Sequence, residues 1–127
     1  MTPASVLAVG IGAALGAWLR WGFISLMNGL MPALPVGTLV SNLVGGYLVG
    51  IAVALFAQHP GFGPEARLFV ITGFLGGLTT FSTFSAESFG LLSRGQIAWA
   101  FAHAGAHLLG SLALTGLGVW TVRLLKG

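Results

Sequence analysis

The stretch Gly73-Phe-Leu-Gly-Gly-Leu-Thr-Thr-Phe-Ser-Thr-Phe-Ser85 decides how this chain folds. It lies inside a long apolar segment, yet it holds three glycines followed by hydroxyl residues that only Phe81 and Phe84 interrupt. Glycine and β-branched threonine both weaken a helix. Because lipid offers no hydrogen-bond partners, non-helical backbone in a membrane survives only where protein buries it or water reaches it. The stretch therefore predicts a broken, hydroxyl-rich span, which is typical of an ion pathway.

The composition is that of an integral membrane protein. Of the 127 residues, 56% are hydrophobic and only 6% are charged, and the mean hydropathy is +0.97, values that soluble domains of this size do not reach. Apolar spans that each reach the ~20 residues required by a bilayer core are expected at 4–27, 36–57, 67–92 and 96–124. The connections are short, so we expect an all-α membrane protein in which residues 1–127 form a single four-helix transmembrane subunit. The absence of cysteine excludes disulfides and thiolate metal sites.

The net charge of +3 comes from basic residues that form no patch, so nucleic-acid binding is not expected. Lys and Arg near the ends of spans instead orient membrane helices. With four spans, one side of the membrane carries Arg67, Arg123 and Lys126, and the other carries Arg20 and Arg94. Three charges against two fix no orientation. Either a single residue or the N-terminal amine decides it, or the protein inserts both ways and pairs antiparallel.

Small residues recur at four-residue spacing in three of the spans. Such pairs let helix backbones approach closely, and we assign them no chemistry beyond that packing. Four short helices can hardly enclose a pore alone, so close packing also indicates an oligomer. The pairs are Gly12 and Gly16, Gly46 and Gly50, and Gly73 and Gly77.

Two polar stripes are expected inside the membrane. Residues at i and i+4 of a helix lie on one face, and polar groups in lipid are costly unless they pair or face water. The fourth span therefore predicts a wet or ion-lined face, and the second span carries a shorter stripe. The residues are His103, His107, Ser111 and Thr115 in the fourth span, and Thr38 and Asn42 in the second, with Ser41 adjacent.

Several of these polar residues allow two interpretations. His103 and His107 could hold a metal through i, i+4 imidazoles, but the spacing offers no third ligand and no HExxH pattern. Asn42 could be interhelical glue or a donor to a passing anion. Arg20, which lies among tryptophans, could anchor the first span or form an electropositive vestibule. Glu87 could couple protons, but a bond to neighbouring helices is the favoured interpretation.

No catalytic pattern is present. The sequence holds no nucleotide-binding loop and no paired carboxylates, and Ser82 and Ser85 have no histidine–acid pair at a recognisable spacing. We therefore expect no enzymatic activity.

Phe81 and Phe84 are three residues apart, so their rings share one face of a helical turn. From spacing alone, core packing is the better interpretation of such a pair. An aromatic ring, however, has a positive edge and a negative face. An edge beside hydroxyl groups stabilises a dehydrated anion without a fixed positive charge, and conduction requires weak, multiple sites. The residues alone leave both interpretations open.

Four segments of the chain together resemble one known family. They are Gly12-Ala-Ala-Leu-Gly-Ala-Trp-Leu-Arg20, Gly37-Thr-Leu-Val-Ser-Asn42 with Gly45 and Gly46, the segment from Gly73 to Glu87, and Gly110-Ser-Leu-Ala-Leu-Thr115. They resemble the Fluc (CrcB) family of bacterial fluoride channels over nearly the whole chain. The third segment is highly specific. At His103 and His107, where tyrosine and serine are expected in some relatives, the chain departs from the pattern.

The resemblance implies a passive, fluoride-selective channel built as a dual-topology, antiparallel homodimer with two separate pores. By motif position, Asn42 is the pore asparagine that donates to fluoride. Phe81 and Phe84 are the pore phenylalanines whose edges face the ion. Arg20 matches the arginine of the family's first helix.

The same resemblance assigns a polar track and a cation site. Thr38, Ser111 and Thr115 fall on the polar track of the pore. The backbone carbonyls of Gly76 and Thr79, at the helix break, match a central sodium site on the dimer axis. The sodium ion would be structural and not transported.

The expected role is therefore export of cytoplasmic fluoride across a bacterial inner membrane, which confers fluoride resistance. The expected partners are a second copy of the chain, fluoride and membrane lipid. The main alternative is a small multidrug-resistance-type, proton-coupled exporter, but such an exporter needs a carboxylate embedded in the membrane, and the first span has none. A purely structural membrane subunit would not require the broken third span.

Overall fold

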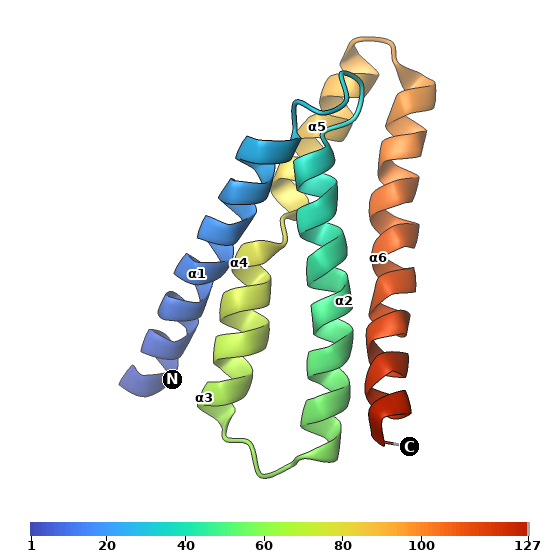
Figure 1. Cartoon of the computed structure of the whole chain (residues 1–127). Coiled ribbons are helices and arrows are strands. Elements are labelled where there is room, and N and C mark those ends of the chain that lie inside the picture. Colours follow the sequence, from blue (N-terminus) through green and yellow to red (C-terminus); the bar gives the residue numbers. More distant parts are fainter. Residues whose placement is uncertain (127) are drawn as a thin grey trace.

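The computed structural model describes residues 1–126 and is all-helical over that range. Three continuous helices, α1 (Pro3–Met27), α2 (Val36–Gln58) and α6 (Ile97–Lys126), and one interrupted span, Pro64–Ser93, are each long and apolar enough to cross a membrane. Both termini and the connection that follows α2 lie at one end of the molecule, and the other two connections lie at the opposite end (Figure 1). The four predicted spans are confirmed, with ends that differ by a few residues.

The third span is broken where two threonines follow the glycines. It begins as α3 (Pro64–Arg67), continues as the π-helical segment η1 (Leu68–Leu75) and the short turn α4 (Gly76–Leu78), and resumes as α5 (Phe81–Ser93). Thr79 and Thr80 have extended backbone, with φ/ψ of −92°/155° and −148°/115°. The predicted break is present, but the glycines themselves stay within helical segments, and the sequence pattern does not foresee the π-helical geometry.

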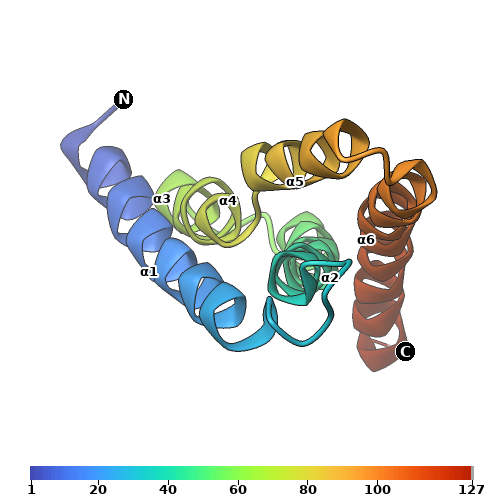
Figure 2. The same ribbon diagram turned by 90° about the horizontal axis from the view of Figure 1, so that it is seen from above.

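The glycines serve close packing, as predicted. A Cβ added at Gly16 would collide with a backbone carbonyl of η1, and one added at Gly77 would collide with the Ala13 carbonyl, so α1 packs directly on the third span. A Cβ at Gly50 would collide with the Thr115 carbonyl, which shows how closely α2 and α6 approach. Figure 2 shows α2 in the middle of the assembly, with α1 and α6 at opposite sides.

The interior contains polar side chains, whereas many large apolar side chains lie on the outer surface. Large apolar side chains such as Phe81, Phe101 and Leu125 are exposed. Among the largest fully buried side chains are Thr38 and His103, together with Leu78, Leu91 and Ser41. Apolar groups on the outside suit a lipid surround, and polar groups that face the interior of a bundle mark a pathway or a network.

Candidate functional site

Side chains from α1 and α2 satisfy part of the backbone that the break exposes. Arg20 Nε donates to the Gly77 carbonyl at 2.9 Å, and the Ser41 hydroxyl donates to the Leu78 carbonyl at 2.7 Å. These carbonyls would otherwise lack the amide donors that a continuous helix supplies. Half-buried Arg20 therefore contacts the break directly.

Asn42 braces the break from α2. Its Oδ1 accepts the Thr80 N–H at 2.7 Å, and its Nδ2 donates to the Thr80 carbonyl at 3.2 Å. The Thr80 hydroxyl caps α5 by accepting the Thr83 N–H at 3.1 Å. In a continuous helix those two amides would instead serve the carbonyls of Gly76 and Thr79. Within residues 1–126, neither of these carbonyls receives a side-chain donor.

A cavity of about 470 Å³ opens beside the break, between α2, the third span and α6. Its walls bring together most of the site residues predicted from the sequence, and within residues 1–126 no lysine or arginine lines it. Thr38 and Arg20, also predicted, are not part of the wall. The polar and aromatic lining residues are Asn42, Thr79, Thr80, Phe81, Phe84, His107, Ser111 and Thr115, and Gly76 is also present.

Phe84 is the centre of an aromatic cluster. Its ring stacks on His103 at 5.0 Å with an interplanar angle of 4°, and it lies 4.7 Å from the His107 ring. Phe81 is tilted against it at 5.5 Å and is 79% exposed. The shared face predicted from the spacing is therefore present. One ring packs against imidazoles, and the other faces outward.

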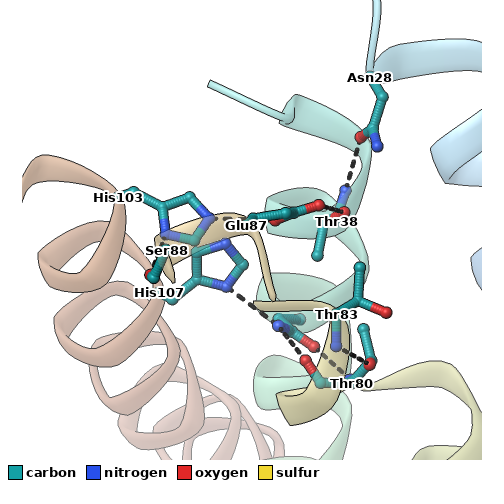
Figure 3. Close-up of polar contacts among 9 residues, drawn as sticks. Asn28, Thr38, Thr80, Thr83, Glu87, Ser88, His103 and His107 are labelled. Atoms are coloured by element: carbon teal, nitrogen blue, oxygen red, sulfur yellow. Dashed lines mark hydrogen bonds and ion pairs between the residues drawn. The ribbon is translucent and has the colours of Figure 1, made fainter. Parts of the chain in front are cut away.

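A polar network joins three helices next to His107 of the cavity wall. Thr38 Oγ1 donates to Glu87 Oε2 at 2.6 Å, His103 Nε2 lies 3.0 Å from Glu87 Oε1, and Ser88 Oγ lies 2.8 Å from His103 Nδ1. Figure 3 shows Glu87 of α5 reaching between Thr38 of α2 and His103 of α6. The favoured interpretation of Glu87, a bond to neighbouring helices, is confirmed. Thr38 contacts this network and not the cavity.

The contacts of Asn42 determine which nitrogen of His107 carries the proton. Asn42 Nδ2 lies 3.0 Å from His107 Nδ1. Because the two bonds to Thr80 fix which end of the amide is the donor, Asn42 donates and Nδ1 accepts. In the neutral ring the proton is then on Nε2. This nitrogen is buried and has no hydrogen-bond partner within residues 1–126.

Sequence spacing does not identify some functional groups that the fold brings together. Ser41 is foreseen only as a neighbour of the polar stripe, and Ser88 is not foreseen at all. Glu87 is a third potential metal ligand that the spacing of His103 and His107 does not reveal, since one ligand atom from each of the three lies within 4.8 Å of the others. The available signal is that Glu87 is the only acid within the four predicted spans.

Comparison with known proteins agrees with this geometry. Residues 7–119 match the family described as "CrcB-like protein, Camphor Resistance (CrcB)". The chain belongs to the CrcB family. The matched region contains the break, the cavity and the polar network, and it confirms the family resemblance noted from the sequence.

Curated relatives resemble the chain over nearly its whole length. A protein of Cupriavidus pinatubonensis is 60% identical over 125 residues, which cover 98% of this chain and 99% of the relative. A protein of Cupriavidus necator is 61% identical over 125 residues, which also cover 98% of this chain and 99% of the relative. One of Nitrosospira multiformis is 60% identical over 119 residues, 94% of this chain and 93% of the relative. Each of these relatives is named "Fluoride-specific ion channel FluC".

Proposed function

We propose that this chain is a fluoride-selective, passive anion channel. The observation that carries the proposal is the cavity beside the helix break, where Asn42, Phe81, Phe84, Ser111 and Thr115 meet in the interior of a four-span bundle. The names of the relatives supply the ion, since each is called fluoride-specific. A channel is not an enzyme, which agrees with the lack of a catalytic pattern.

The lining suits an anion that must bind and leave again. Hydroxyl groups and aromatic edges are weak partners for an anion, and weak, multiple sites permit conduction. Asn42 has protein partners for its amide, Thr80 and His107. A passing fluoride would therefore take the place of His107 Nδ1 as the acceptor of one N–H. The Thr115 hydroxyl already donates to the carbonyls of Gly46 and Ser111, so Ser111 is the freer of the two hydroxyls.

The functional unit that we propose is an antiparallel homodimer inserted in both orientations. The nearly balanced basic charges on the two sides support it. Phe81 supports it as well, because a ring that lines the cavity and is 79% exposed in one copy leaves the path open on that side. A second copy would close this wall and produce two pores.

A sodium ion at the centre of that dimer fits the backbone at the break. Arg20 and Ser41 donate to the carbonyls of Gly77 and Leu78. The N–H groups that would reach the carbonyls of Gly76 and Thr79 in a continuous helix donate instead to Asn42 and to the Thr80 hydroxyl. Carbonyl oxygens without donors are suitable ligands for a hard cation. When bound, sodium would supply positive charge that holds the two breaks together.

Export needs no coupling to an energy source. Hydrogen fluoride is a weak acid that crosses lipid as a neutral molecule and dissociates in a near-neutral cytoplasm, where fluoride is trapped. An interior-negative potential drives the anion outward with ~2.3 kcal/mol per 100 mV. The place for such a channel is the bacterial inner membrane, and the result is fluoride resistance.

Ion flux from liposomes tests the proposal. Purified protein should release fluoride rapidly when a potassium ionophore balances the charge, and it should release chloride far more slowly. A small multidrug-resistance-type exporter would instead move a quaternary ammonium ion in exchange for protons, driven by a proton gradient. Fluoride release no faster than that from empty liposomes would refute the channel.

A further inference from the structure

Glu87, His103 and His107 form a buried cluster that anion conduction does not explain. One ligand atom from each lies within 4.8 Å of the others. His103 is fully buried, His107 is 5% exposed, and the Glu87 side chain is 15% exposed, so the carboxylate is the open edge of the cluster. Two imidazoles and a carboxylate are a ligand set that Zn²⁺ and Cu²⁺ favour.

Two of the three ligand atoms are already spaced nearly as a metal requires. His103 Nε2 and Glu87 Oε1 are 3.0 Å apart, and two ligands of one tetrahedral zinc, each at ~2.0–2.1 Å, lie about 3.3–3.5 Å from each other. A metal would replace the proton between them. In a neutral His103 ring that proton moves to Nδ1, where the Ser88 hydroxyl, at 2.8 Å, turns to accept it.

Each ligand also has a partner that fixes its orientation. Ser88 contacts the second nitrogen of His103, Thr38 donates to the second oxygen of Glu87, and Asn42 contacts the second nitrogen of His107. Such outer contacts are typical of metal sites in proteins.

The unpartnered Nε2 of His107 completes the set. It is a buried N–H with no acceptor within residues 1–126, and Figure 3 shows the His107 ring beside the His103 ring and near the Glu87 side chain. If the neutral ring moved this proton to Nδ1, Nε2 would become free to bind a metal. Nδ1–H would then face the donor end of Asn42. Asn42 would have to turn its amide and release both contacts with Thr80.

We propose that Glu87, His103 and His107 bind a divalent transition metal of the Zn²⁺ or Cu²⁺ class, with water in the fourth position, and that this metal inhibits the channel. Binding turns Asn42 away from Thr80 and so disturbs both the break and the cavity wall. The site is separate from the proposed sodium position, which uses backbone carbonyls. The inhibition rests on the proposed function, whereas the binding does not.

Metal binding is measured first, on the intact protein in detergent. Co²⁺ replaces Zn²⁺ as a spectroscopic probe, and a visible absorption band typical of tetrahedral coordination should appear at one equivalent per chain. His103→Gln, His107→Gln and Glu87→Gln should each weaken binding at least ~10-fold, and Ser88→Ala, which leaves all three ligands in place, should weaken it ~10-fold. The matched control is His59→Gln, which removes an exposed histidine of the loop after α2.

Fluoride release from liposomes then tests the inhibition. Zn²⁺ should slow fluoride release by the parent and by His59→Gln to the same extent, and it should not slow release by His107→Gln. Each rate is compared with that of the same protein without metal. The site is overturned if the parent shows no cobalt band, if the three ligand variants and Ser88→Ala bind Co²⁺ like the parent, or if His59→Gln abolishes binding. If the parent releases no fluoride, the channel proposal fails, and the cobalt titration still decides the metal site.

Discussion

At the scale of single residues, Phe84 joins the apolar and polar parts of the site. Its ring lies flat on His103, which bonds to Glu87, while it also borders the cavity. Phe81 has no such support and is mostly exposed. Substitutions at Phe81 and Phe84 therefore distinguish the loss of a contact with the anion from the loss of packing.

Replacing either ring by isoleucine should lower fluoride release. Phe81→Ile and Phe84→Ile keep much of the apolar bulk but delete the positive ring edge. A loss of ~1 kcal/mol of anion stabilisation, the usual scale of an aromatic contact, corresponds to about a 5-fold slower passage. The measurement is fluoride release from liposomes, with size-exclusion chromatography to show that the variant remains folded. If both variants conduct like the parent, the rings are packing residues and the pore lies elsewhere.

Asn42→Asp should block the channel more completely than either ring substitution. Aspartate keeps an acceptor for the Thr80 N–H, but it loses the donors that face the Thr80 carbonyl and His107. It also places a negative charge beside the path, where a wall of low dielectric strengthens repulsion of the anion. We expect release at the level of empty liposomes. Asn42→Gln retains a donor without the charge, and it should conduct better than the aspartate variant.

At the scale of elements, the sequence predicts the break but not the way it is held. Helix-weakening residues in an apolar span can be recognised from the sequence alone, and so can the four spans and the glycine pairs that pack closely. The donors that hold the break come from other helices: Arg20 from α1, and Ser41 and Asn42 from α2. The bond of Glu87 to His103 likewise depends on how α5 and α6 meet after the turn. Spacing within one segment carries no information on such contacts.

The break also predicts a dependence on the cation. If sodium binds the carbonyls of Gly76 and Thr79, replacing it on both sides by a large organic cation should weaken dimerisation or slow fluoride release, since the ion no longer offsets their partial negative charge. Sodium itself should not cross. The measurements are fluoride release and radioactive sodium uptake in matched liposomes. The sodium site would be contradicted if fluoride release and dimerisation did not depend on the cation and a high-resolution map showed no bound ion.

At the scale of the whole molecule, the distribution of charge predicts how the protein inserts. The termini and the α2–α3 connection share one side, which carries three of the five basic residues. Gly61→Lys with Gly63→Lys would raise that side to five against two, because two lysines join the three already there. An added Cβ at Gly61 meets nothing within 4 Å, and at Gly63 it lies 3.5 Å from Glu65 Oε2, so the fold should accept both. Most copies should then insert in one orientation, and fluoride release should fall.

A complementary variant decides whether that loss comes from orientation. Gly29→Lys and Gln96→Lys add two charges on the opposite side, and Arg123→Gln with Lys126→Gln removes two exposed charges from the first side, which makes the count four against one. Co-expression of the two variants should restore release, because an antiparallel dimer needs one copy of each orientation. Orientation is measured independently by labelling an introduced Leu30→Cys from outside the cell, since the natural chain has no cysteine. If the first variant is fully active while every copy is labelled from the same side, the two pores do not require antiparallel partners. The exposed Phe81 then needs another explanation, either lipid or a parallel neighbour.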